Sequence, residues 1–120
     1  MKRILLVEDD KNVRRLLKEE LNDEGYSITV ASNGKEALSM LQKKENEKPD
    51  LIILDLRMPK MDGFETMGHI LKSRQDTPVI IHTAYSSYKN DVMVMAADAY
   101  VEKSHDLKKL KDVIKDLIGT

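Results

Sequence analysis

Short runs of apolar residues alternate with helical patterns five times along this chain of 120 residues. The runs at positions 51–54 and 79–81 contain no polar residue, which is typical of strands that helices cover on both faces of a parallel sheet. The expected strands are Arg3–Val7, Ser27–Ala31, Leu51–Leu54, Val79–Thr83 and Ala99–Val101.

Between these runs, apolar residues recur three and four positions apart, as they do on one face of an amphipathic helix. The residues of these faces are Val13, Leu16, Leu17 and Leu21; Ala37, Leu38 and Leu41; Phe64, Met67, Ile70 and Leu71; Val92, Met95 and Ala96; and Leu107, Leu110, Val113, Ile114 and Leu117. The alternation predicts an α/β fold, a doubly wound five-stranded parallel sheet with helices on both faces. We expect residues 1–120 to form one domain of this kind.

The composition excludes several classes of protein. Twenty basic and 21 acidic side chains leave a formal net charge of −1, so no global charge bias favours binding to nucleic acid or to an anionic membrane. The absence of cysteine excludes disulfides and thiolate metal sites. The apolar runs are too short to cross a bilayer. We therefore expect a cytoplasmic domain without a nucleic-acid or membrane partner.

Side chains that could take part in binding or catalysis follow four of the expected strands. Glu8 and Asp9 come directly after the first strand, and Asp55 comes directly after the third. Thr83 ends the fourth strand, and Lys103 lies just beyond the fifth. In doubly wound sheets, ligands bind outside the carboxyl ends of the strands. We expect these five side chains to converge on one crevice at that edge.

Three carboxylates in one crevice require a compensating cation or proton. The oxygen ligands of Glu8, Asp9 and Asp55 suit Mg²⁺, whereas a site without cysteine or a nearby histidine suits zinc and copper poorly. With Mg²⁺ and the ammonium of Lys103 present, a phosphoryl group can approach Asp55, whose carboxylate can attack phosphorus to form an acyl phosphate. The hydroxyl of Thr83 is a suitable donor to the phosphoryl oxygens.

At these positions the sequence resembles the receiver domain of two-component response regulators, and the resemblance covers the whole chain. Its motifs are Leu6–Asp10 (LVEDD), Asp55–Pro59 (DLRMP) with Asp62-Gly63, His82–Ala84 (HTA), and Lys103. The resemblance implies the flavodoxin-like sheet topology of receivers. It also implies a phosphoprotein that acts in phosphorelay signal transduction.

The resemblance further implies roles for the residues at the predicted metal site. Asp55 is the implied phosphoacceptor, and Asp9 is the implied direct ligand of Mg²⁺. Glu8 would act on the metal through bound water, and the backbone carbonyl of Arg57 would complete the ligands that the protein supplies. Glu8 stands where aspartate is commoner in the family, a conservative change for a ligand that acts through water.

By the same resemblance, Thr83 is the switch hydroxyl, Lys103 contacts the phosphoryl group, and Tyr100 changes rotamer on activation. The implied phosphoryl donor is a sensor histidine kinase or a histidine phosphotransferase that docks near the first helix. A downstream protein target would bind the surface of the fourth helix, fifth strand and fifth helix, with phosphorylation-dependent homodimerisation as a further expectation. Candidate contacts on this surface are Tyr88, Met93, Tyr100, His105 and Lys108. Such a domain is not an enzyme beyond catalysing its own phosphorylation and dephosphorylation.

Two further departures from the family pattern concern three positions. Ser104 follows Lys103 where the family usually has proline, which removes the usual reason for a cis peptide bond. Arg57 and Tyr85 occupy positions associated with phosphoryl lifetime. Because a long basic side chain and a bulky aromatic can screen an acyl phosphate from water, they predict slow loss of phosphate.

Other functions fit the sequence less well. A flavodoxin-like cofactor binder needs a loop rich in Ser, Thr or Gly after the first strand, where this chain has Glu8, Asp9 and Asp10. A phosphatase of the haloacid dehalogenase type has a second aspartate two residues after the nucleophile, where this chain has Arg57. The remaining alternative is a receiver-like interaction module that does not cycle phosphate.

For three features the sequence favours a structural role. Asp10 is expected to cap the first long helix, and Asp62-Gly63 is expected to form a turn and helix entry. His82 neighbours Thr83 but faces the opposite side of the strand, because side chains alternate with period two. We therefore expect His82 to be a packed core histidine and not a metal ligand.

Overall fold

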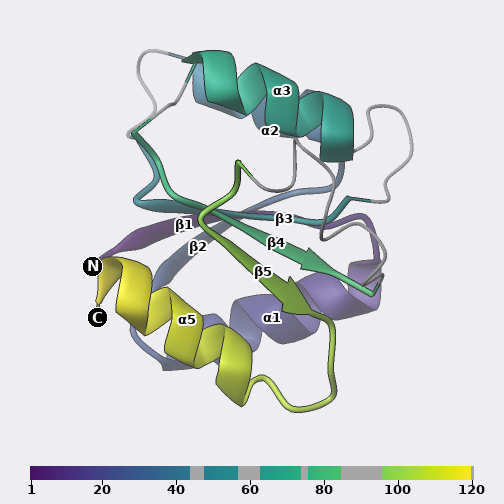
Figure 1. The fold of residues 1–120 in the computed structure, drawn as a ribbon. Helices are drawn as coiled ribbons and strands as arrows, with labels where there is room; N and C mark the ends of the chain where they lie inside the picture. Colours follow the sequence, from purple (N-terminus) through teal and green to yellow (C-terminus); the bar gives the residue numbers. More distant parts are fainter. Residues whose placement is uncertain (44–47, 57–62, 74–75, 85–95, 120) are drawn as a thin grey trace.

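The computed structural model describes residues 1–43, 48–56, 63–73, 76–84 and 96–119. The five expected strands form one parallel sheet with the order β2-β1-β3-β4-β5 (Figure 1). Their bounds are β1 (Arg3–Val7), β2 (Ser27–Ala31), β3 (Leu51–Leu54), β4 (Val79–Thr83) and β5 (Ala99–Glu102). The predicted doubly wound sheet is confirmed, and β5 ends one residue later than expected.

Helices cover both faces of the sheet, with α1 and α5 on one face and α2 and α3 on the other (Figure 1). Their bounds are α1 (Lys11–Asp23), α2 (Gly34–Gln42), α3 (Gly63–Ser73) and α5 (Lys108–Ile118). The helix expected around positions 92–96 falls mainly within residues 85–95, which lie outside the described residues. Within the described ranges, no helix has the length and apolar character needed to span a membrane.

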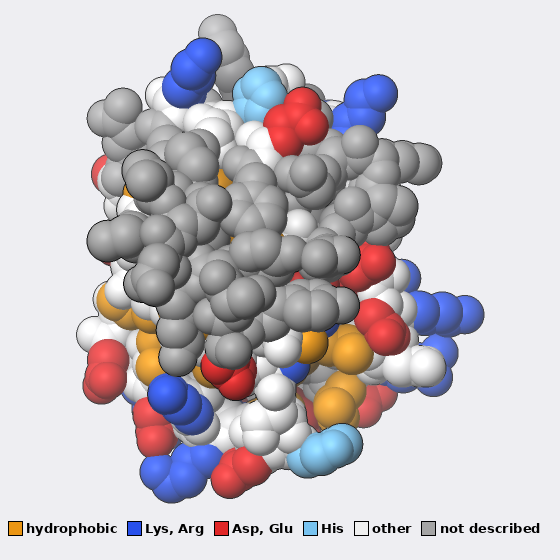
Figure 2. All heavy atoms as spheres, turned by 45° about the vertical axis from the view of Figure 1, so that its right-hand side comes forward, with side chains coloured by type: hydrophobic (Ala, Val, Ile, Leu, Met, Phe, Trp, Pro, Cys, Tyr) orange, Lys and Arg blue, Asp and Glu red, His pale blue; other side chains and the backbone are white. Residues whose placement is uncertain are grey.

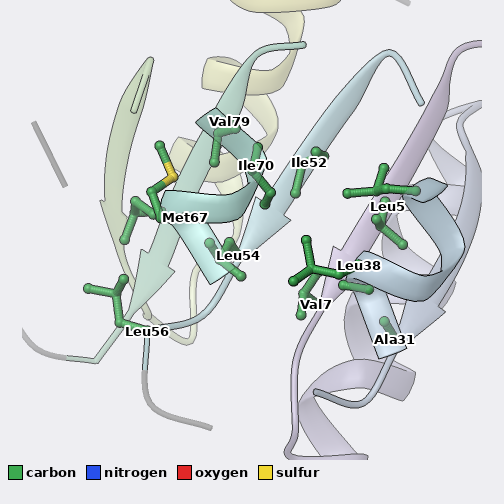
Figure 3. Close-up of a cluster of buried hydrophobic side chains, with 13 residues drawn as sticks. Leu5, Val7, Ala31, Leu38, Ile52, Leu54, Leu56, Met67, Ile70 and Val79 are labelled. Carbon is green, nitrogen blue, oxygen red and sulfur yellow. The ribbon is translucent and has the colours of Figure 1, made fainter. Parts of the chain in front are cut away.

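The strand side chains form a hydrophobic cluster on each face of the sheet. Leu5 and Val7 belong to the cluster beneath α2 and α3, part of which is shown in Figure 3. Ile4 and Leu6 belong to the cluster on the α1 and α5 face. All four residues of β3 are buried, because this strand lies in the middle of the sheet with helices on both sides. This double burial explains why positions 51–54 show no polar alternation.

Local backbone and side-chain features define both ends of α1. The side-chain oxygen Oδ1 of Asp10 accepts hydrogen bonds from the backbone N–H groups of Asn12 at 2.9 Å and Val13 at 3.2 Å. The expected N-cap is therefore confirmed. After the helix, Gly25 adopts a φ of 99°, a conformation that glycine reaches without a Cβ penalty. This glycine lets the chain turn from α1 into β2.

Leu16 departs from the expected apolar face of α1. Its side chain is 49% exposed, whereas Leu17 and Leu21 are buried. Successive residues of an α-helix lie about 100° apart around the axis, so Leu16 points well away from the direction of Leu17. The spacing of three and four positions predicted the helix correctly, but the predicted buried face included one residue that is exposed.

Charged side chains of both signs are spread over the surface. In the described part of the face shown in Figure 2, Lys and Arg side chains lie among Asp and Glu side chains. Some of them form ion pairs, such as Lys108 with Asp112 at 2.8 Å on α5. This mixture agrees with the balance of 20 basic and 21 acidic residues, and it produces no strong field of one sign over this part of the surface.

Candidate functional site

The loop from β1 to α1 places two acids at the carboxyl edge of the sheet. The backbone N–H of Glu8 donates to the carbonyl of Ala31 at 3.0 Å, which extends the β1–β2 ladder by one residue. The Glu8 side chain is buried, with only 1% of the residue exposed, and its Oε2 accepts from the N–H of Asp10 at 3.1 Å. Asp9, the next residue, is exposed. One acid is thus fixed inside the site while the other faces solvent.

Asp55 lies directly beside these acids because its strand is the neighbour of β1. Its N–H donates to the carbonyl of Val7 at 3.0 Å, so the ladder continues past the end of β3. The residue is 5% exposed. Glu8, Asp9 and Asp55 each offer a carboxylate oxygen, and these atoms lie within 4.8 Å of one another. The structure therefore brings together the three acids that the sequence analysis selected.

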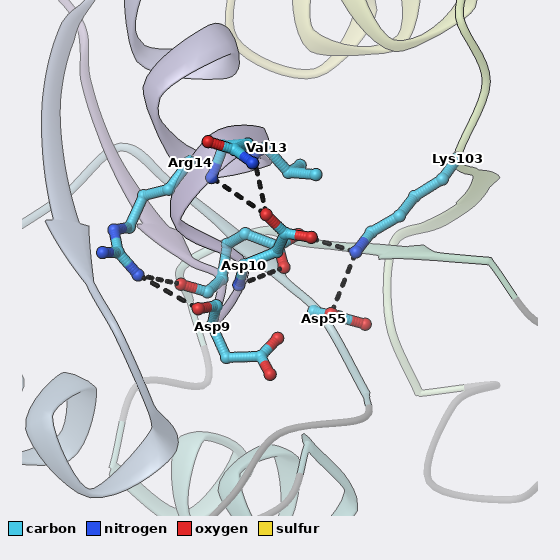
Figure 4. Close-up of polar contacts among 8 residues, drawn as sticks. Asp9, Asp10, Val13, Arg14, Asp55 and Lys103 are labelled. Carbon is cyan, nitrogen blue, oxygen red and sulfur yellow. Dashed lines mark hydrogen bonds and ion pairs between the residues drawn. The ribbon is translucent and has the colours of Figure 1, made fainter.

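Lys103 reaches into the same cluster from the end of β5 (Figure 4). Its Nζ lies 2.8 Å from Oε1 of Glu8 and 3.0 Å from Oδ2 of Asp55. Its backbone N–H donates to the carbonyl of Thr83 at 2.8 Å, which joins the ends of β4 and β5. The peptide between Lys103 and Ser104 is trans. The lysine thus bridges the two buried carboxylates without the proline that usually follows it in the family.

The charges of the cluster act strongly on one another. The pKa of Glu8 is raised to about 7, mainly by burial and also by the charge of Asp55, against the lowering effects of Lys103 and the Asp10 amide. Burial alone would lower the pKa of Lys103, but the hydrogen bonds and charges of Glu8 and Asp55 outweigh it and raise the pKa. Three carboxylates face one ammonium here, so the cluster retains excess negative charge.

The donor set fits a hard divalent cation. All three acids supply oxygen, the ligand that Mg²⁺ prefers, and Mg²⁺ is usually held by one or two carboxylates together with several waters. Both oxygens of Glu8 already accept contacts from within the protein, Oε1 from Lys103 and Oε2 from the Asp10 amide. A bound water therefore suits Glu8 better than direct ligation does. Asp9 and Asp55 could supply further carboxylate oxygens to the same cation.

Thr83 and His82 occupy opposite sides of β4, as the strand period predicts. Thr83 is fully buried at the carboxyl edge. His82 is buried as well, and its Nδ1 has no hydrogen-bond partner within the described part of the chain. Burial lowers the pKa of His82 to about 4, with a contribution from the charge of Lys103, so the imidazole is neutral near pH 7. The expectation of a packed core histidine is confirmed.

The described part of the chain covers most, but not all, of the predicted site. Tyr100 is half-buried and packs against the cluster on the α2 and α3 face. Arg57, the predicted source of a carbonyl ligand, lies outside the described residues. The same holds for Tyr85, Tyr88 and Met93. Their roles stay predictions from the sequence.

Comparison with known proteins gives the family. The family model described as "Response regulator receiver domain" matches residues 4–115. The chain belongs to this family. The response regulator MprA of Mycobacterium leprae is 36% identical over 118 residues, which cover 97% of this chain and 50% of that protein. A probable transcriptional regulator, ycf27 of Porphyridium aerugineum, is 34% identical over 118 residues, covering 97% of this chain and 48% of that protein. This receiver domain thus spans about half the length of the curated relatives it matches.

Solved structures agree with this receiver fold. The response regulator TrrA of Thermotoga maritima, solved in complex with Mg²⁺–BeF, is 49% identical with a TM-score of 0.90, and the match covers 98% of this chain and 99% of that chain. TrrA in complex with the histidine kinase ThkA matches with 48% identity and a TM-score of 0.88, over 98% and 99% of the two chains. The resemblance to receivers and the predicted topology are both confirmed.

One residue of the site was missed by the sequence reasoning. The guanidinium Nη1 of Arg14 donates to the backbone carbonyls of Glu8 at 3.0 Å and Asp9 at 3.3 Å. The available signal was its place on the first turn and a half of α1, four residues after the N-cap Asp10. Because arginines on amphipathic helices usually face solvent, this spacing alone does not single Arg14 out.

Proposed function

We propose that this receiver domain is a phosphorylation-dependent switch in which Asp55 accepts a phosphoryl group. The donor is the phosphohistidine of a sensor histidine kinase or a histidine phosphotransferase, and the domain works in the cytoplasm. One observation carries the proposal: the buried carboxylate of Asp55 has the Nζ of Lys103 at 3.0 Å and carboxylate oxygens of Glu8 and Asp9 within 4.8 Å. The match to a response regulator solved with a histidine kinase supports the choice of donor.

The proposed cofactor is Mg²⁺. Asp9 and Asp55 would hold it directly, Glu8 would act through bound water, and the carbonyl of Arg57 would complete the ligands from the protein. When bound, Mg²⁺ supplies positive charge that offsets the carboxylates and the phosphoryl oxygens. The oxygen-only cluster and the related TrrA structure with Mg²⁺–BeF support this choice.

For phosphoryl transfer, the protein must supply a nucleophile and compensate the negative charge of the phosphoryl group. A carboxylate oxygen of Asp55 forms a bond to phosphorus while the bond between phosphorus and the donor imidazole nitrogen breaks. The electron pair of that bond stays on the imidazole. Before transfer the ammonium of Lys103 lies 3.0 Å from Oδ2 of Asp55, and it then pairs with the phosphoryl oxygens. The domain catalyses only its own phosphorylation and the later hydrolysis, and no other reaction.

The output of the switch begins at Thr83 and Lys103. The Lys103 N–H donates a hydrogen bond to the Thr83 carbonyl. A displacement of either residue would therefore move the ends of both β4 and β5. A new dianion at Asp55 would attract both side chains, and Tyr100 on β5 would change rotamer. The surface that includes β5 and α5 would then bind a downstream protein, or a second phosphorylated copy of the domain.

Mass spectrometry of the intact protein tests the proposal. After treatment with acetyl phosphate and Mg²⁺, the chain should gain one phosphoryl group, and it should gain none without the metal. The Asp55→Asn variant should gain none under either condition. Asp112→Asn, which changes an exposed acid on α5, is the matched control and should react like the wild type. An unmodified wild type, or an adduct that persists in Asp55→Asn, would show that Asp55 is not the acceptor.

A further inference from the structure

Arg14 holds the acidic loop from the side opposite Lys103 (Figure 4). Its Nη1 donates to the carbonyl oxygens of Glu8 and Asp9, at 3.0 and 3.3 Å. The side chain is half-buried, whereas its neighbour Arg15 is exposed. Lys103 contacts the side-chain carboxylate of Glu8, whereas the contacts of Arg14 are to the backbone carbonyls of Glu8 and Asp9. The two cations therefore act on different parts of the same loop.

The two carbonyls that Arg14 contacts belong to the peptide units on either side of the Asp9 Cα atom. Each peptide unit is planar, so the dihedral angles φ and ψ of Asp9 are set by how these two planes are turned. A single guanidinium nitrogen that binds both carbonyls fixes one plane relative to the other. The direction of the Asp9 side chain follows from that relation. An exposed carboxylate is in this way aimed at the cluster by a contact to its backbone.

Within the described part of the chain, two N–H groups of this loop have partners other than Arg14. The N–H of Glu8 is held by Ala31, and the N–H of Asp10 is held by the Glu8 carboxylate. These bonds fix the two ends of the segment through its donors. Arg14 supplies donors for the acceptors between them.

We infer that Arg14 is a positioning residue for the divalent metal site: it fixes the backbone of Glu8 and Asp9 so that the Asp9 carboxylate is directed at the metal. The inference deepens the proposed function and rests on it. Arg14 does not touch the metal or the phosphoryl group in this role. Its loss should therefore weaken metal binding and leave phosphoryl transfer intact once the metal is bound.

Titration with Mn²⁺, followed by the electron paramagnetic resonance signal of the free ion, measures the predicted effect. Loss of a hydrogen-bonded charged donor should weaken Mn²⁺ binding by Arg14→Ala by about three- to tenfold. Arg14→Lys, which keeps one charged donor without the planar fork, should recover part of this loss. The control Arg15→Ala should bind Mn²⁺ within about twofold of the wild type, because an exposed charge on the same helix contributes little.

Phosphorylation by acetyl phosphate over a range of Mg²⁺ concentrations gives a second readout, one that a general loss of structure would not produce. In Arg14→Ala, the Mg²⁺ concentration for half-maximal rate should rise by the factor found for Mn²⁺. The rate at saturating Mg²⁺ should stay close to that of the wild type. Circular dichroism checks that each variant is folded, and Arg14→Gln replaces Arg14→Ala if the alanine variant is not.

Three outcomes separate the inference from the function on which it rests. Wild-type Mn²⁺ affinity in a folded Arg14→Ala variant overturns the inference, and so does a fall in the saturated rate with unchanged half-saturation. A wild type that binds Mn²⁺ but forms no adduct at Asp55 refutes the proposed function and leaves the metal comparison standing. A wild type that binds no Mn²⁺ refutes both.

Discussion

Lys103 both stabilises the acidic cluster and would compete with a divalent cation that binds there. Its ammonium lies 2.8 Å from Oε1 of Glu8 and 3.0 Å from Oδ2 of Asp55, within the region that a divalent cation would share. In the metal-free domain this contact lowers the repulsion between two buried carboxylates. When a metal binds, the same positive charge repels it. Lys103 therefore acts on metal affinity in the direction opposite to Arg14.

Replacing Lys103 with glutamine should tighten Mn²⁺ binding. The variant removes a full positive charge a few ångströms from the site, and we expect the Kd for Mn²⁺ to fall by at least about fivefold. The titration belongs near pH 8.5, because the loss of Lys103 raises the pKa of Glu8 further and the carboxylate must be ionised to attract the metal. The electron paramagnetic resonance signal of free Mn²⁺ gives the affinity.

Lys108→Gln is the matched control for this charge change. Lys108 is an exposed lysine of α5 that pairs with Asp112 at 2.8 Å, so its loss should leave the Mn²⁺ affinity unchanged. Equal or weaker Mn²⁺ binding by Lys103→Gln would contradict the competition between lysine and metal.

At this scale the sequence predicted which residues form the acidic cluster better than it predicted the residue that contacts their backbone. Glu8, Asp9, Asp55 and Lys103 were recognisable because each follows an apolar run, and parallel strands bring their carboxyl ends to one edge. Arg14 was not recognisable, because its function depends on where two backbone carbonyls point after folding. The spacing of residue types in a sequence does not predict how individual backbone carbonyls are oriented.

At the scale of elements, the strands were predicted to within one residue and the helices less sharply. The buried run of β3 is an unambiguous signal because helices cover both faces of the sheet. The predicted apolar face of α1 wrongly included Leu16, which is exposed. The rule accepts any apolar residue three or four positions from another one, so it selected both Leu16 and the adjacent Leu17. Asp10 was assigned correctly because capping is a local interaction, decided within three residues.

The cap of α1 can be tested by Asp10→Ala. The variant loses the two hydrogen bonds that the N–H groups of Asn12 and Val13 donate to Oδ1, and the free energy of unfolding should fall by about 1 kcal/mol. Asp10→Ser restores a capping oxygen and should recover most of that loss. Urea unfolding followed by circular dichroism, in EDTA, measures both variants. If serine is as destabilising as alanine, the carboxylate acts through its charge and not as a cap.

For the whole molecule, the acidic site and the core histidine make opposite contributions to stability against pH. The pKa of Glu8 is raised from 4.5 to about 7, so its contribution is fully present below pH 4.5 and is lost as the pH rises through 7. The pKa of His82 is lowered from 6.5 to about 4, so its contribution is present above pH 6.5 and is lost as the pH falls through 4. Between about pH 4.5 and 6.5 the two slopes oppose each other.

Two variants should separate these slopes. In Glu8→Gln, the free energy of unfolding relative to the wild type should rise with pH between 4.5 and 7, because the group that binds a proton in the folded state is gone. In His82→Leu, it should fall relative to the wild type as the pH rises from 4 to 6.5. Each slope should approach about 1 kcal/mol per pH unit.

Urea unfolding in EDTA at a series of pH values measures these differences without a contribution from bound metal. Subtracting the wild-type curve removes the titration of groups that Glu8 and His82 do not influence, so each difference reports the replaced side chain together with its coupled neighbours. Curves that stay parallel to the wild type would show that Glu8 and His82 titrate alike in the folded and unfolded chains. Opposite slopes would show that folding raises the pKa of Glu8 and lowers the pKa of His82.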